Sequence, residues 1–65
     1  MSDKEKLMIT KESVQCALIL MHRALSEARS AELGTEVTKV LEKAEMDVSS
    51  AHYSIVNQLK KTYNV

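Results

Sequence analysis

The sequence has no proline, tryptophan or phenylalanine, and it has a single glycine and a single cysteine among 65 residues. A strand-rich fold of this length needs several tight turns, and the residues that form them are missing. Tyr53 and Tyr63 are the only aromatic side chains, so the stacking platform typical of single-stranded nucleic-acid binders is not expected. The lone Cys16 excludes an intrachain disulfide and fits a reducing compartment such as the cytoplasm.

An excess charge of one sign and a long hydrophobic run are also absent. Nine Lys and Arg residues balance nine Asp and Glu residues, so no net field draws the chain to nucleic acid or to an anionic membrane. The longest apolar run, residues 16–21, has six residues, whereas a membrane-spanning helix needs roughly 20. We expect no membrane segment and no signal peptide.

The short length limits the stability that one chain can reach. A domain of this size buries only about 60% of its unfolded surface, and its core supplies about 3–5 kcal/mol. Small scaffolds therefore need a disulfide, a metal or a second chain. Because a disulfide is excluded, the composition predicts that oligomerisation or a partner completes the fold.

Apolar residues recur with the period of an α-helix in the first half of the chain. Thr10 is a suitable N-cap, with Glu12 in the first turn, and Gly34 is suited to the left-handed position after the last turn. A helix is predicted over residues 11–33. Its apolar stripe comprises Val14, Leu18, Met21, Leu25 and Ala28.

A second helix is predicted over residues 36–62, capped by Thr35 and with Glu36 in its first turn. Its apolar stripe comprises Val37, Leu41, Ala44, Val48, Ala51 and Ile55. The connection is so short that the helices must fold back on each other. The predicted fold class is all-α, a two-helix antiparallel hairpin over residues 10–65.

Residues 1–9 allow two interpretations. Ser2 and Glu5 have capping-box spacing, so a short extra helix over residues 3–8 could rest Leu7 and Met8 on the hairpin. The alternative is a frayed, charged terminus.

The residues offer little chemistry. His22 and His52 could share a zinc ion with Cys16 or Glu12, but no paired ligand spacing supports such a site. Cys16 has no basic neighbour in the chain that would activate it as a nucleophile. No glycine-rich loop is present to hold a phosphate. We therefore expect neither catalysis nor a cofactor.

The most informative feature is an excess of apolar surface. The first helix is apolar on every side between Cys16 and Met21, whereas a single neighbouring helix covers only one stripe. One explanation is that Leu7 and Met8 fold back over Ile19. The other is an interface with a helical protein or with a second copy of the chain. The residues predicted to form it are Cys16, Ile19, Leu20, Tyr53, Val56 and Tyr63.

The spacing of Leu20, Ala24 and Leu25, the break at Gly34, and the group Ala51, Ile55, Val56 and Leu59 resemble a known family. Small two-helix co-chaperones of type III secretion systems have this size and apolar pattern. The resemblance implies a non-enzymatic, cytosolic protein that binds a helical-repeat chaperone and helps to hold the needle subunit unpolymerised. It also implies that an apolar helix face packs into the partner.

Two other classes share the architecture. The stretch 41–44, followed by Met46 and Ala51, is similar to phage hairpins that oligomerise and sequester cyclic nucleotides, although Asp47 stands where those have an aromatic residue. A small anionic ligand would then require basic side chains to converge between subunits, with Arg23, Arg29, Lys39 and Lys43 as the candidates. A dimeric regulatory four-helix bundle is the third alternative.

Overall fold

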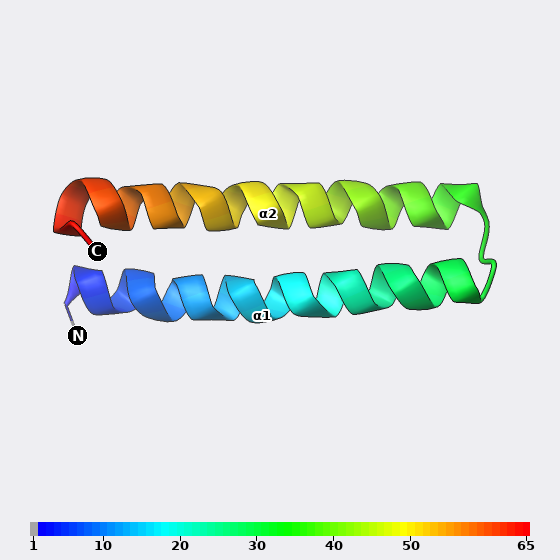
Figure 1. Cartoon of the computed structure of the whole chain (residues 1–65), viewed down its shortest axis with the longest axis horizontal. Coiled ribbons are helices and arrows are strands. Elements are labelled where there is room, and N and C mark those ends of the chain that lie inside the picture. Colours follow the sequence, from blue (N-terminus) through cyan, green and yellow to red (C-terminus); the bar gives the residue numbers. More distant parts are fainter. Residues whose placement is uncertain (1) are drawn as a thin grey trace.

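The protein is an antiparallel pair of long helices. The computed structural model describes residues 2–65, in which α1 (Asp3–Ser30) and α2 (Thr35–Tyr63) lie side by side (Figure 1). The hairpin measures 44 × 17 × 14 Å, and residues 2–65 contain no strand. The predicted all-α hairpin is confirmed. Neither described helix has a stretch that is both long enough and apolar enough to cross a membrane.

The first helix begins at Asp3, well before the predicted start at residue 11. Ser2 is the N-cap, and its hydroxyl oxygen accepts a hydrogen bond from the Glu5 N–H at 3.2 Å. The predicted cap at Thr10 is wrong, because the Thr10 hydroxyl instead donates to the Lys6 carbonyl, one turn back inside the helix, at 2.8 Å. No glycine or proline interrupts residues 3–30, so the helix is continuous. The frayed terminus is therefore also wrong.

The turn uses its residues differently from the prediction. α1 ends at Ser30, after which the Leu33 N–H donates to the Ala28 carbonyl and the Glu32 N–H donates to the Arg29 carbonyl, both at 3.2 Å. This is a Schellman motif, and its left-handed position is filled by Glu32 at φ 54°, not by glycine.

Gly34 has another role, at the start of the second helix. It is the N-cap of α2, with φ 98° and ψ 161°, a backbone conformation that is essentially restricted to glycine. Thr35, the predicted cap, is instead the first helical residue, and no side chain caps this end. The single glycine is therefore placed where the chain needs it most, which leaves a glutamate in the left-handed position.

Replacing Glu32 by glycine should raise the free energy of unfolding by about 1 kcal/mol, because glycine adopts the left-handed conformation without a Cβ penalty. Urea unfolding followed by circular dichroism measures the change. The matched control is Gly34→Ala. Its Cβ meets no atom within 4 Å, so it should lower stability by about 1–3 kcal/mol through backbone strain alone. Equal effects of the two substitutions would contradict this description of the turn.

The seam between the helices is thin. On α1, the predicted stripe is buried or half-buried and continues one step further towards the N-terminus, to Leu7. Across residues 2–65, only three apolar residues are nearly fully buried: Leu25, Ala28 and Leu59. The hairpin therefore depends on a few side chains, with Leu25 at 6% exposure and Leu59 at 2%.

The inward face of α2 is rotated from the predicted stripe. Leu41, Val48 and Ile55 face α1 as predicted, but Ala51 is exposed, and Glu45 and His52 are half-buried in the seam. The predicted stripe and the residues that face α1 in the structure both follow helical spacing, so periodicity alone does not show which of the two faces inward. His52 thus lies in the seam in place of Ala51, whereas Ala44 and Glu45 are both half-buried.

Candidate protein-binding surface

The predicted interface residues of α1 form a row on the side of the helix away from α2. Leu18 faces the seam, and Cys16 and Leu20 lie two positions to either side of it, rotated by about 200°. Cys16, Ile19 and Leu20 are exposed, whereas Leu18 is half-buried. The exposed fraction is 60% for Leu20 and 66% for Ile19. Together with Ile9, which is also exposed, these residues form what we term the outer stripe: Ile9, Cys16, Ile19 and Leu20.

No segment of the described chain covers the outer stripe. One sequence-based explanation placed Leu7 and Met8 over Ile19, and the structure contradicts it. Residues 3–30 form one helix, so Leu7 and Met8 lie along the same rod, several turns from Ile19. Leu7 turns into the seam, and Met8 is exposed. The apolar surface of Ile19 is therefore open.

The predicted interface residues of α2 do not join the outer stripe. Tyr53 is 68% exposed on the second helix, whereas Val56 and Tyr63 are half-buried beside the seam. Tyr63 lies four residues after the buried Leu59, which places its ring near the core. The six predicted residues thus fall into an exposed group on α1, an isolated tyrosine on α2, and two residues that support the fold.

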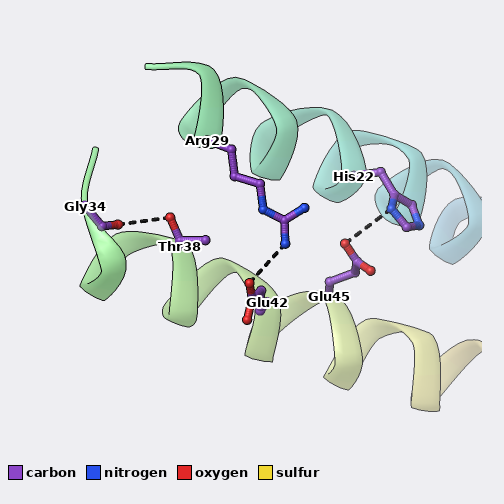
Figure 2. A network of polar contacts seen from close by, with 6 residues as sticks. All are labelled: His22, Arg29, Gly34, Thr38, Glu42 and Glu45. Atoms are coloured by element: carbon purple, nitrogen blue, oxygen red, sulfur yellow. Dashed lines mark hydrogen bonds and ion pairs between the residues drawn. The ribbon is translucent and has the colours of Figure 1, made fainter. Parts of the chain in front are cut away.

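One ion pair and one further polar contact cross the seam on one side of the hairpin, which we term the ion-paired side. The Arg29 guanidinium donates to Glu42 Oε1 at 3.0 Å, and His22 Nδ1 lies 3.3 Å from Glu45 Oε2 (Figure 2). Near the turn, the Thr38 hydroxyl donates to the Gly34 carbonyl at 2.9 Å. This side of the hairpin is therefore bridged by polar contacts between the helices.

The opposite side is apolar. On α1, Ala17 precedes the inward Leu18 whereas His22 follows the inward Met21, so the alanine and the ion-paired histidine flank opposite edges of the seam. On α2, Val40 precedes Leu41 and Glu42 follows it.

Because the ion-paired edges of the two helices meet each other, the two apolar edges must also meet each other. We term the resulting surface the apolar flank. It comprises Ala17, Ala24, Val37, Val40, Ala44 and Ala51.

The sequence pattern assigns Val37 and Ala51 to the core stripe of α2, so it does not predict the apolar flank. Val40 is 65% exposed and Val37 is also exposed. An open hollow of about 410 Å³ lies beside them, lined by Glu36, Val37, Val40 and Leu41. A valine or alanine one position before an inward-facing leucine marks the flank. This pattern can be recognised only when the face of α2 that packs on α1 is already known.

Three of the four basic candidates for an anionic ligand already contact carboxylates. Arg23 lies 3.6 Å from Glu27, and Lys43 donates to Asp47 at 2.9 Å, both one turn apart on the same helix. Arg29 is bound to Glu42 across the seam, beside Lys39 in a hollow at the turn. Carboxylates in the same places weaken the attraction for an anion.

No three His, Cys, Asp or Glu side chains in residues 2–65 are arranged to hold a metal ion. His22 and His52, the candidate zinc ligands, have separate surroundings. His22 contacts Glu45 and is largely exposed, whereas His52 lies in the seam with its Nε2 buried and without a hydrogen-bond partner.

Comparison with known proteins gives no identification: no family, no curated protein and no solved structure matches the chain.

Proposed function

We propose that the protein is a non-enzymatic adaptor or co-chaperone that packs the outer stripe against a helical partner protein. The observation that carries the proposal is Ile19, which is 66% exposed on a face of α1 that no other segment of residues 2–65 covers. Cys16, Ile19 and Leu20 have the i, i+3 and i+4 spacing of one helix face, which suits a hydrophobic groove on another protein.

The partner expected from this surface is a helical protein with an apolar groove. The outer stripe runs along one rigid helix, with Glu12 between Ile9 and Cys16 and Arg23 after Leu20, so an apolar groove with polar groups near these two charges would match it. The resemblance to type III secretion co-chaperones supports a helical-repeat chaperone as partner and the cytosol as the place of action. Both of these remain part of the proposal.

Site-specific photo-crosslinking in the cells that make the protein tests the proposal. A photoreactive amino acid at position 19 should capture one helical protein. The same residue at position 50 should not, because Ser50 is exposed on α2 and lies two positions from both Val48 and His52, so it faces away from α1. Equal capture from both positions, or no capture from position 19, would refute the outer stripe as the binding surface.

A further inference from the structure

The hairpin exposes more surface than a self-sufficient protein of its mass. Its accessible surface is 4999 Å² for 7.3 kDa. Folded monomers of that mass expose about 4,200 Å². The excess of about 800 Å² equals the area that each partner buries in a standard protein–protein interface.

The apolar flank has the composition of a surface that fits itself. Val37 and Val40 project at the turn end of the flank, beside a hollow, and the small side chains of Ala44, Ala24, Ala51 and Ala17 follow further from the turn. A two-fold axis across the helices would lay the valines of one copy against the alanines of the other. A two-fold interface brings the same patch of two copies together, so it needs projections and hollows on one surface. Small residues also let helix backbones approach closely.

The charges on and around the flank allow two copies to meet. None of the six flank residues is charged, and the neighbouring Asp47 lies at the border, where its carboxylate is bound by Lys43 at 2.9 Å. The formal net charge is +0, so two identical chains have no net repulsion to overcome. A second copy is therefore a physically suitable occupant.

We infer that the apolar flank is a homodimer interface, at which two hairpins pack flank against flank into a four-helix bundle. The ion-paired sides then face outward, and the outer stripe stays open beyond the border residue Leu20. The inference does not depend on the proposed partner, because it concerns a different surface.

Sedimentation equilibrium of the purified chain tests the inference. The wild type should sediment at twice the mass of one chain. Val40→Glu should weaken the dimer at least about a hundredfold, because the two-fold axis places two carboxylates in the apolar interface. Circular dichroism reports whether the variant is still helical, as expected for a residue outside the core.

Ser26→Glu is the matched control, since residues 26 and 40 lie at similar heights on the two helices but on opposite sides of the hairpin. It should dimerise like the wild type. A wild type that stays monomeric would overturn the inference. So would a dimer that tolerates Val40→Glu, or one that both substitutions weaken equally.

A second measurement does not depend on how well Val40→Glu folds. In a Cys16→Ser background, Ala24→Cys should give covalent dimers with a short bifunctional thiol reagent, whereas Ser26→Cys should not. Dimers from both positions, or from neither, would count against the flank.

Discussion

Replacing Leu25 by alanine should leave the purified chain largely unfolded at 25 °C. Leu25 is one of three apolar residues that are nearly fully buried in residues 2–65. Truncating a buried leucine costs about 2–5 kcal/mol, and a chain of this length has about 3–5 kcal/mol in total. Circular dichroism at 222 nm, with urea titration, measures the remaining helix and the midpoint of unfolding.

Leu20→Ala is the control for this experiment, because it makes the same change in the same helix at a side chain that is 60% exposed. It should change the free energy of unfolding by no more than about 0.5 kcal/mol. If Leu25→Ala unfolds at the same urea concentration as Leu20→Ala, the seam does not hold the fold in the way described.

Replacing Ile19 by aspartate should abolish the complex with the partner and leave the helices intact. Position 19 is open to water in the free chain, so a carboxylate there costs little. In a complex, the same carboxylate would lose its water against an apolar groove without a cation beside it, a cost of several kcal/mol. Loss of at least about a thousandfold in affinity is expected, measured by titration calorimetry with the partner that crosslinking identifies.

The control for Ile19→Asp is Ser50→Asp, which adds the same charge at an exposed position on the outward side of α2. It should bind as the wild type does. Normal binding by Ile19→Asp would remove the outer stripe from the proposal and would leave the inferred homodimer on the apolar flank untouched.

The architecture could be predicted because it depends on features that one helix shows by itself. The stripe Val14, Leu18, Met21, Leu25 and Ala28 has only one helical face on which to lie, and it lies there in the structure. The missing prolines and the single glycine limit the chain to one break. The exposed outer stripe followed from the same reasoning, because a second apolar face has no place in a two-helix seam.

The predictions that were wrong concern the start of α1 and the turn, where two residues or two roles compete. Ser2 and Thr10 are both good caps, and the helix starts at the earlier one because nothing between them stops it. Gly34 could end α1 or begin α2, and the stricter φ and ψ at the start of α2 decide the choice.

Which face of α2 turns inward depends on its contacts with α1, and these cannot be read from α2 alone. Ala51 and His52 compete for the seam, and the structure places His52 there and leaves Ala51 exposed, whereas Ala44 and Glu45 are both half-buried. The apolar flank is a consequence of that rotation, which is why it could not be read from the sequence.

The central claim is that another chain completes this hairpin at its exposed apolar surface. Native mass spectrometry of the tagged protein, purified gently from its own cells, tests it most directly. We expect masses above that of one chain: a dimer of the hairpin that is bound to a second helical protein. A folded species found only at the single-chain mass of 7.3 kDa, plus the tag, would contradict it.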